Sequence, residues 1–376
     1  MVHSLNTGKI KFEWITTWQD VWNDSFLSLW RNWMSNSPNA NVFFEPSVVR
    51  AWFDTYASLR NIEPRFLVAR LEDECIVFLP LIYDRGGWKD AWQRSIVPVG
   101  FSEFDYHDPI VSGNFQNRGM EIFWNELQPA IKDQWARMYE SFQIPRLRFP
   151  PDNISSNSSF RDEVPWIDIS QFNSVESFVS QKGLRHRREE VHRRIRKLEE
   201  HGSLSHVVYD RSGSTEAKEF LSQFMNAHSR RWPNASTPYS FYANLYSNCL
   251  DEKLLVMSSL RLNMEPISWR LLFVYRDTLL IYVQAFLPDY ASFSPGSVHF
   301  AYVLDWAMKK GLKRVILGRG KEKWKTEWTR ESFPLYSIGW ESSGMRPYVC
   351  RLWQVHIRPK LVQVKRMIFK RAPKTL

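Results

Sequence analysis

The fold of this chain is decided by residues 294–325, which read SPGSVHFAYVLDWAMKKGLKRVILGRGKEKWK. Ser294 is a candidate N-cap and Pro295 suits a first helical position, so the stretch predicts a helix over 295–310. Gly311 then suits a left-handed helix stop. One face of this helix is apolar at helical spacing and carries Phe300, Ala301, Leu304, Ala307 and Met308.

A predicted strand, Thr278–Phe286, comes before this helix, so the first helical turn lies beyond the end of the strand. The turn is small and contains a glycine. Its N–H groups and the positive end of the helix dipole favour an anion there. Simple helix capping is the alternative interpretation of Ser294, Gly296 and Ser297, and both interpretations stay open.

Length and charge limit the classes of protein. A chain of 376 residues favours two domains, and an apolar content of 44% is enough for large cores. The net charge is +10, but residues 347–376 hold eight of the Lys and Arg residues and no acid. The remainder is therefore nearly neutral, which argues against a general nucleic-acid-binding protein.

Targeting signals and metal motifs are not expected. The first twenty residues hold no long apolar run, and no run of about 18 apolar residues occurs anywhere. The 3 cysteines are far apart, which favours neither a disulfide framework nor a metal site. These patterns predict a cytoplasmic protein without a metal cofactor.

The predicted elements follow a similar order in both halves: helices, then an antiparallel meander, then a helix and a strand. A polar, proline-containing break near 150–165 separates the halves. We expect an α/β (α+β) protein in which each domain is a mixed, mainly antiparallel sheet flanked by helices. The expected segments are domains over 1–160 and 161–346 and a basic tail or helix over 347–376, in which Pro359 interrupts any single helix.

The second half resembles the CelD/BcsL-type acetyltransferases, a branch of the GNAT superfamily related to the FemAB-like aminoacyltransferases. The likeness covers roughly residues 40–345. Five short motifs carry the likeness. They are the arginine-rich helix Gly183–Gly202, the set His228, Arg231 and Trp232, the pair Phe241-Tyr242, the turn Ser294-Pro295-Gly296, and the turn Gly318-Arg319-Gly320 with Glu322, Trp324 and Lys325. In the first half, Asp105–Pro109 resembles a loop common in these proteins.

The resemblance implies two GNAT-like domains, of which the first is a degenerate copy and the second performs direct acyl transfer. The implied donor is an acyl-CoA such as acetyl-CoA, with its pantetheine arm along strand 278–286 and its diphosphate at the start of helix 295–310. The implied cofactor-binding residues are Gln284, Phe286, Ser294, Gly296 and Ser297. The implied acceptor is a small molecule or glycan, an amine or hydroxyl of a sugar or other envelope-related metabolite, contacted by Arg319, Arg231, Trp232 and Tyr242. The candidate catalytic residues are Lys325, Trp324 and His228.

Two positions depart from the family pattern. Ile316 stands where the family usually has Asp, and Trp324 stands where it usually has Tyr. A Tyr hydroxyl can protonate a leaving thiolate, whereas an indole N–H cannot usefully do so. These departures keep open a non-catalytic, GNAT-derived scaffold for polysaccharide synthesis. For Lys325 and Arg319 the alternative is a surface ion pair, and for His228 it is a hydrogen-bonded histidine at a helix end.

Basic segments leave two further partners open. Helix 182–201 carries eight basic and four acidic residues, so an aminoacyl-tRNA donor is an alternative in which Arg187, Arg188 and Arg193 bind nucleic acid. The tail over 347–376 mixes apolar and basic residues, which favours peripheral attachment to an anionic membrane surface. A packed helix with a basic outer face is the alternative for the tail.

Overall fold

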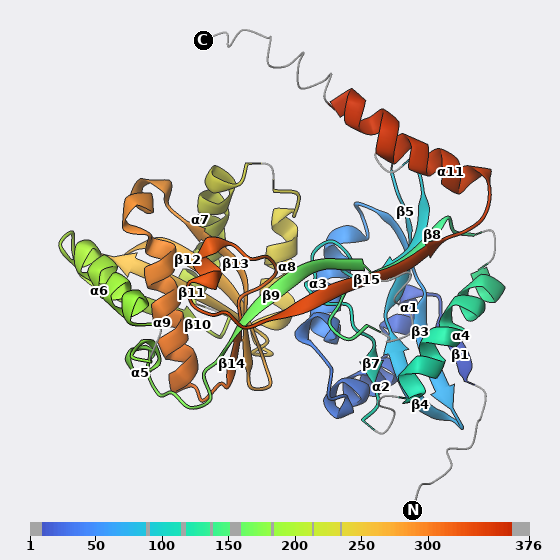
Figure 1. Cartoon of the computed structure of the whole chain (residues 1–376), viewed down its shortest axis with the longest axis horizontal. Coiled ribbons are helices and arrows are strands. Elements are labelled where there is room, and N and C mark those ends of the chain that lie inside the picture. Colours follow the sequence, from blue (N-terminus) through green and yellow to red (C-terminus); the bar gives the residue numbers. More distant parts are fainter. Residues whose placement is uncertain are drawn as a thin grey trace, which may run out of the picture. The chain divides into compact units, whose positions relative to one another are not determined.

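The computed structural model describes residues 10–87, 91–113, 118–135, 138–150, 159–181, 184–212, 214–233 and 235–362. The chain forms two compact units (Figure 1). Unit 1 comprises residues 1–40, 56–159 and 336–376, and unit 2 comprises residues 41–55 and 160–335. Each unit is therefore assembled from separate stretches of chain, which differs from the contiguous domains expected.

Unit 2 is built on six strands in the order β10-β11-β12-β13-β14-β9. All neighbouring strands in this order are antiparallel except β13 and β14, which are parallel. This is the mixed, mainly antiparallel sheet that the sequence predicts. The strands are β9 (Ser159–Asp168), β10 (Leu204–Tyr209), β11 (Leu255–Leu262), β12 (Glu265–Tyr275), β13 (Thr278–Phe286) and β14 (Arg314–Ile316).

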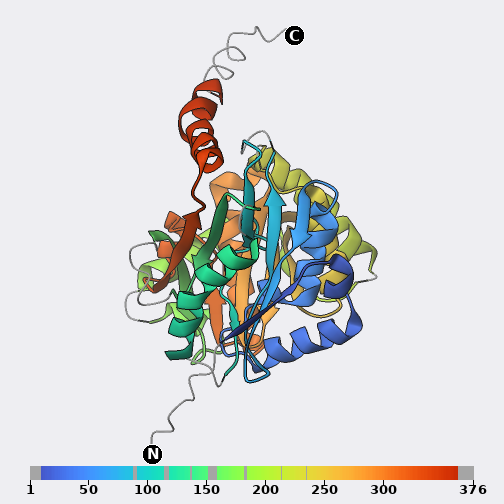
Figure 2. The same ribbon diagram turned by 90° about the vertical axis from the view of Figure 1, so that its right-hand side faces the viewer.

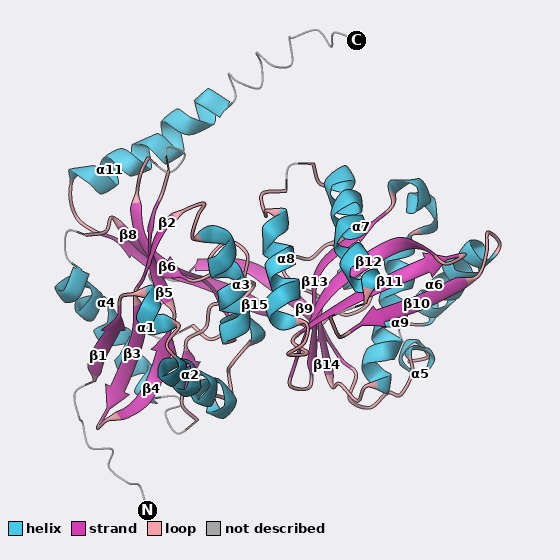
Figure 3. Ribbon diagram, turned by 180° about the vertical axis from the view of Figure 1, so that it is seen from behind, coloured by secondary structure: helices cyan, strands magenta, loops and turns pink. Residues whose placement is uncertain are grey.

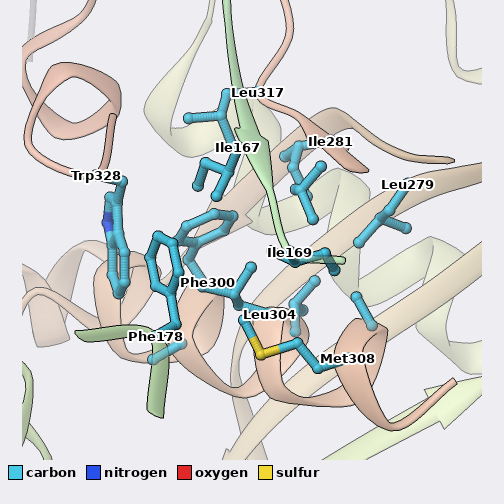
Figure 4. Close-up of a cluster of buried hydrophobic side chains, with 14 of the residues drawn as sticks. Ile167, Ile169, Phe178, Leu279, Ile281, Phe300, Leu304, Met308, Leu317 and Trp328 are labelled. Atoms are coloured by element: carbon cyan, nitrogen blue, oxygen red, sulfur yellow. The ribbon is translucent and has the colours of Figure 1, made fainter. Parts of the chain in front are cut away.

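Helices cover both faces of the unit 2 sheet. On one face α5 (Val175–Val179), α6 (Arg185–Glu199) and α9 (Pro295–Lys309) enclose the main apolar core (Figure 4). On the other face α7 (Thr215–Arg231) and α8 (Tyr239–Cys249) lie in front of the strands when the molecule is seen from behind (Figure 3). The predicted apolar face of α9 supplies the centre of the core, where Phe300 packs on Trp328 with ring centroids 4.9 Å apart.

The turn before α9 differs from the one expected. The helix begins at Pro295 as predicted, but the Ser294 side chain does not cap it, and Ser294 is left-handed at φ 54° and ψ 53°. Proline disfavours the right-handed helical region for the residue that precedes it, which explains the choice of another region. The Ser294 carbonyl accepts hydrogen bonds from the N–H groups of Ser297 at 2.9 Å and Val298 at 3.3 Å.

Unit 1 repeats the same scheme (Figure 2). It holds a sheet in the order β1-β3-β4-β7 and strands in the order β15-β8-β6-β5-β2. β6 and β8 are its parallel pair, and the chain between them includes α4, as the chain between β13 and β14 includes α9. The repetition agrees with two related domains.

The elements of unit 1 are β1 (Lys11–Ile15), α1 (Trp18–Val21), α2 (Asp24–Asn36), β2 (Asn61–Pro64), β3 (Phe66–Leu71), β4 (Glu74–Leu79), β5 (Leu81–Arg85), β6 (Arg94–Pro98), β7 (Ile110–Val111), α4 (Arg118–Trp135), β8 (Ser141–Leu147) and α11 (Met345–Leu352). α3 (Pro46–Tyr56) lies almost wholly in unit 2, and β15 (Ser332–Glu341) begins in unit 2 and ends in unit 1.

The loop Asp105–Pro109 is part of the framework of unit 1. The buried Asp108 carboxylate accepts hydrogen bonds from the Arg148 backbone at 2.7 Å and from its Nε at 2.7 Å. Phe149 N–H donates to the same carboxylate at 3.1 Å. The loop residues are therefore fixed by local contacts.

The expected interruption of the tail helix at Pro359 is wrong. After α11 the chain continues through a π-helical turn, Trp353–Ile357, and stays helical to residue 362. A π-helical turn is wider than an α-helical one, so it accommodates a residue that has no N–H for the regular bond. Residues 151–158 of the predicted polar break, the first two residues of the predicted helix over 182–201 and the basic residues beyond 362 lie outside the described residues.

A buried chain of hydrogen bonds crosses unit 2 from β10 to β13. Ser268 Oγ donates to the Ala285 carbonyl at 3.2 Å, which makes it an acceptor for His299 Nδ1 at 3.0 Å. His299 Nε2 then accepts from Ser258 Oγ at 2.8 Å, and Ser258 Oγ accepts from His206 Nε2 at 2.7 Å. Since a carbonyl only accepts, His299 Nδ1 is the donor to Ser268, and because burial keeps His299 neutral, its Nε2 is the acceptor from Ser258.

These histidines make the unfolding free energy depend on pH. Burial, and then the charge of Arg270, lowers the pKa of His206 to about 4 and that of His299 well below its usual value. In the unfolded chain the pKa of both histidines is about 6.5, so below that pH the unfolded state binds their protons before the folded state does. We expect the free energy of unfolding to fall as pH drops from about 6.5 toward about 4, by up to about 1.4 kcal/mol per pH unit for each histidine.

Urea unfolding of His206→Gln measures this effect, because the glutamine amide retains the donor to Ser258 and does not titrate. The loss of stability on acidification should shrink in this variant. His201→Gln, at an exposed histidine, is the matched control and should keep the wild-type slope. Equal slopes in the two variants contradict the prediction.

Candidate active site

The parallel pair β13 and β14 stays together over only three positions. Thr278, Leu279 and Leu280 lie opposite Arg314–Ile316. β13 then continues to Phe286, whereas β14 ends. The edge of β13 over 281–286 is therefore not paired by β14.

Pairing with β9 explains why β14 leaves β13. Leu317 N–H donates to the Pro165 carbonyl at 2.9 Å, and Gly320 N–H donates to the Glu163 carbonyl at 2.9 Å. The chain beyond β14 thus continues to follow β9 on its other side. The two parallel strands diverge because one of them stays bound to a third strand.

A β-bulge lies within the open edge. Leu271 of β12 is opposite Val283, whereas the next residue, Leu272, is opposite Ile281. Tyr282 is the extra residue of this bulge. Bulges redirect side chains, and they are frequent beside active sites.

The five predicted cofactor-binding residues meet at the end of this edge. A Cβ atom added at Gly296 would lie 3.6 Å from the Phe286 ring and 4.0 Å from Gln284 Oε1, which are ordinary contact distances. Ser294 and Ser297 belong to the same first turn of α9. The turn therefore faces the open part of β13 across a narrow gap that admits a small side chain at Gly296.

Lys325 closes the turn that follows β14. Its Nζ donates to the Gly318 carbonyl at 3.1 Å and to the Arg319 carbonyl, and it forms an ion pair with Glu322 at 2.7 Å. An ammonium group has three N–H donors, and these three contacts use them. They favour a role for buried Lys325 in holding the turn, and they place the partly exposed Arg319 at its corner.

Trp324, in α10 (Lys323–Thr326), forms a wall of the site. Its ring lies 5.7 Å from that of Phe300 and 5.6 Å from the Arg270 guanidinium carbon. Ile316 is the last residue of β14, opposite Leu280. Apolar contact is thus the main contribution of the two positions that depart from the family pattern.

A cavity of about 500 Å³ lies on the α7 side of the sheet. It is lined by the predicted residues His228, Trp232 and Tyr242 together with Pro233, Ala235, Ser236, Thr237 and Val283. Val283 is next to the bulge, so the cavity borders the open strand. His228, Trp232 and Tyr242 are therefore brought together in this cavity, whereas the predicted acceptor residues Arg319 and Arg231 are not among its lining residues.

His228 is the titratable group in this cavity wall. Burial, and then the charge of Arg231, lowers its pKa, so the ring is neutral at pH 7. Its ring packs against those of Phe224 and Tyr242, at centroid distances of 5.5 and 6.2 Å. Neither ring nitrogen has a hydrogen-bond partner within the described ranges, and a neutral imidazole in that state can accept a proton.

Arg231 connects the two sets of predicted residues. Its guanidinium carbon lies 4.0 Å from the Phe286 ring centroid and 5.2 Å from that of Trp232. One contact belongs to the donor set and the other to the cavity wall. Burial lowers the Arg231 pKa.

Sequence reasoning missed Arg270, which is only 1% exposed on β12. Its Nη2 donates to the Gly296 carbonyl at 2.7 Å, directly below the first turn of α9. The signal available in the sequence was that Ser268 and Arg270 are two polar residues, separated by one apolar residue, within a mostly apolar predicted strand. No group of three His, Cys, Asp or Glu side chains that would hold a metal occurs in the described part of the chain.

Comparison with known proteins agrees with this geometry. Residues 185–326 match the family model described as an acetyltransferase (GNAT) domain. A solved structure of FemX is 10% identical, with a TM-score of 0.57 over 87% of this chain and 98% of its own. L-PGS from Bacillus licheniformis is 12% identical, with a TM-score of 0.53 over 88% of this chain and 96% of its own. No curated protein sequence matches the chain.

At such identities the solved structures establish the fold, which is GNAT-like. The family match and this fold indicate an acyltransferase. The finer CelD/BcsL type stays a prediction. None of the helices within the described ranges has the length and apolar character needed to cross a membrane.

The contacts of Lys325 predict a structural effect of its removal. Lys325→Met leaves two carbonyls of the turn without their donor, which costs about 1–3 kcal/mol of unfolding free energy. Lys323→Met, at an exposed lysine of α10, is the matched control and should be close to neutral. Urea denaturation of both variants is the measurement, and equal stabilities contradict the assigned role.

Proposed function

We propose that this chain transfers an acyl group from an acyl-CoA to an amine or hydroxyl of a sugar or other envelope-related metabolite. The open edge of β13 is the observation that supports it best. The backbone N–H and C=O groups along an open strand edge can bind an extended ligand in the way that they would bind an added strand. A pantetheine arm carries amide groups that can form such hydrogen bonds. The edge ends at the first turn of α9, where the helix dipole favours the donor diphosphate.

In this proposal the thioester carbonyl lies beside the bulge at Tyr282 and the acceptor enters from the cavity. The acceptor nitrogen or oxygen forms a bond to the carbonyl carbon, the C–S bond breaks, and coenzyme A leaves as a thiolate. Neutral His228 takes the proton that the acceptor loses. Trp324 is packed against Phe300 and supplies no acid, so the thiolate takes its proton from solvent.

The structure weakens the case for an aminoacyl-tRNA donor. Buried Arg187 is paired with Glu190 at 2.7 Å and Glu327 at 2.6 Å, and Arg188 is paired with Glu176 at 2.5 Å. Two of the three arginines considered for nucleic acid are therefore neutralised within unit 2. The fold likeness to FemX keeps this donor as an outcome of the test below.

Coenzyme A binding tests the proposal. Thermal unfolding of the full chain should show stabilisation by free coenzyme A and by acetyl-CoA. Gly296→Glu should abolish it, because the carboxylate repels the diphosphate and exceeds the gap to Phe286. Gly296→Ala is the matched control and should retain it, since a Cβ there makes ordinary contacts.

Each alternative donor has its own result. Absence of any response to coenzyme A, with salt-sensitive binding of tRNA that Arg193→Glu weakens, replaces the proposal by the FemAB-like reaction. Absence of both responses supports the non-catalytic scaffold.

We also propose that the C-terminal helix attaches the protein to an anionic membrane surface. The helical segment formed by α11 and the residues that follow it to 362 contacts the rest of unit 1 through Arg346 Nε, 2.9 Å from the Glu140 carboxylate, and through Gln354, which donates to Gln93 at 2.7 Å. The same segment exposes apolar side chains, which are Met345, Tyr348, Val349, Val355, Leu361 and Val362. The sequence from residue 342 onward holds nine Lys and Arg residues and no acid, which matches an anionic interface.

Vesicle co-sedimentation measures this attachment. Binding to vesicles with anionic lipid should exceed binding to neutral vesicles, and Val349→Asp with Val355→Asp should reduce it about tenfold or more. Leu59→Asp, at an apolar residue of unit 1 that is 61% exposed, is the control and should bind as the wild type does. Unchanged pelleting of the double variant contradicts the proposal.

A further inference from the structure

Arg270 is a buried cation without an anion. Its guanidinium packs against Phe300 and Trp324, whose ring centroids are 5.4 and 5.6 Å from its central carbon. Nη2 binds the Gly296 carbonyl, whereas Nε and Nη1 have no hydrogen-bond partner. Burial, and then the charge of Arg231, lowers the Arg270 pKa to about 9.

Arg231 adds a second cation to the same place. Its charge acts on Arg270, and its Nη1 is also buried without a partner. Among the described residues, no carboxylate lies within ion-pair distance of either guanidinium. Two cations without an anion repel each other, and the desolvation of the fully buried Arg270 is not compensated by a negative charge. The site is therefore electrostatically incomplete in the ligand-free chain.

Two other enclosed arginines among the described residues face anions, and buried Arg146 donates to three backbone carbonyls. Arg187 is 5% exposed and faces two carboxylates, and Arg148 binds the buried Asp108. Arg270 also lies opposite Gln284 in the β12–β13 register, two residues from the bulge. The unpaired charge is thus placed at the open part of β13, where the acyl group and the acceptor meet in the proposed reaction.

We propose that the substrate carries a carboxylate, which binds between Arg270 and Arg231. This inference rests on the proposed acyl transfer and specifies its substrate class. The carboxylate belongs either to a dicarboxylic acyl group or to an acidic acceptor such as a uronic acid. Arginine N–H groups bind carboxylates strongly, and the apolar rings around Arg270 strengthen such a contact by excluding water.

Matched ligand pairs test this proposal on the full chain. Succinyl-CoA is compared with acetyl-CoA, and D-glucuronate is compared with D-glucose in the presence of coenzyme A. Thermal unfolding and calorimetry should show that the carboxylated member of one pair binds about tenfold or more tightly. The pair that responds identifies whether donor or acceptor carries the group.

Arg270→Met should abolish that difference, so that both members of the responding pair bind equally. Because Nη2 also holds the Gly296 carbonyl, this variant should bind coenzyme A itself more weakly, and the difference within the pair is therefore the readout. Arg270→Lys, which keeps the charge, should retain part of the difference if the methionine variant folds poorly. Arg187→Met is the matched control at a buried but paired arginine, and it should keep the difference. Without ligand, Arg270→Met should raise the unfolding temperature, because it removes an unpaired charge, whereas Arg187→Met should lower it.

Three results overturn the inference. Equal binding within both pairs shows that no carboxylate is recognised. A difference that persists within the pair in Arg270→Met, with equal weakening of both members, assigns the cation to the diphosphate turn. A lower unfolding temperature for ligand-free Arg270→Met, as for Arg187→Met, shows that the guanidinium supports the fold alone. If the wild-type protein binds coenzyme A but binds both members of each pair equally, only this inference is overturned. If the wild-type protein does not bind coenzyme A, the proposed donor is overturned as well.

Discussion

The whole site depends on the pairing of one short strand with two neighbours. β14 is parallel to β13 for three residues and antiparallel to β9 on its other side. Beyond Ile316 the chain keeps its hydrogen bonds to β9 and loses those to β13. A strand that follows only one neighbour opens the edge of the other. The opening is thus a consequence of hydrogen bonding within the sheet.

The elements around this opening have separate tasks. Lys325 holds the turn after β14 through main-chain carbonyls, and this turn positions Trp324 as a wall. Beyond the bulge at Tyr282, Val283 lines the cavity, whereas the neighbouring Gln284 and Phe286 lie against the first turn of α9. As a result, His228 and the first turn of α9 lie on opposite faces of a single strand. An acyl donor and an acceptor that approach from the two faces meet at its edge.

The sequence was sufficient for elements with a strong local pattern. The helix over 295–310, the strand over 278–286 and the fold class were predictable, because periodicity and turn residues lie within one stretch. Ser294 was predicted as a side-chain cap, but the proline after it restricts its backbone instead. Pro359 was predicted to end a helix, but a π-helical turn accommodates it.

Long-range features were beyond sequence reasoning. The place of β9 beside β14, and the inclusion of residues 41–55 in unit 2, depend on contacts between distant segments. For the same reason, the sequence predicted only part of the candidate site. Ser-Pro-Gly and the residues near His228 carry local motifs, whereas Arg270 is one basic residue in a strand, and its lack of a partner is visible only in three dimensions.

Hydrogen–deuterium exchange of the full chain with and without coenzyme A tests the central claim most directly. If the donor arm binds as an added strand, backbone N–H groups within 281–286 become protected on binding, together with those at the start of α9. The rest of the unit 2 sheet, which is already paired, should change little. Binding of coenzyme A without added protection of residues 281–286 would contradict this account.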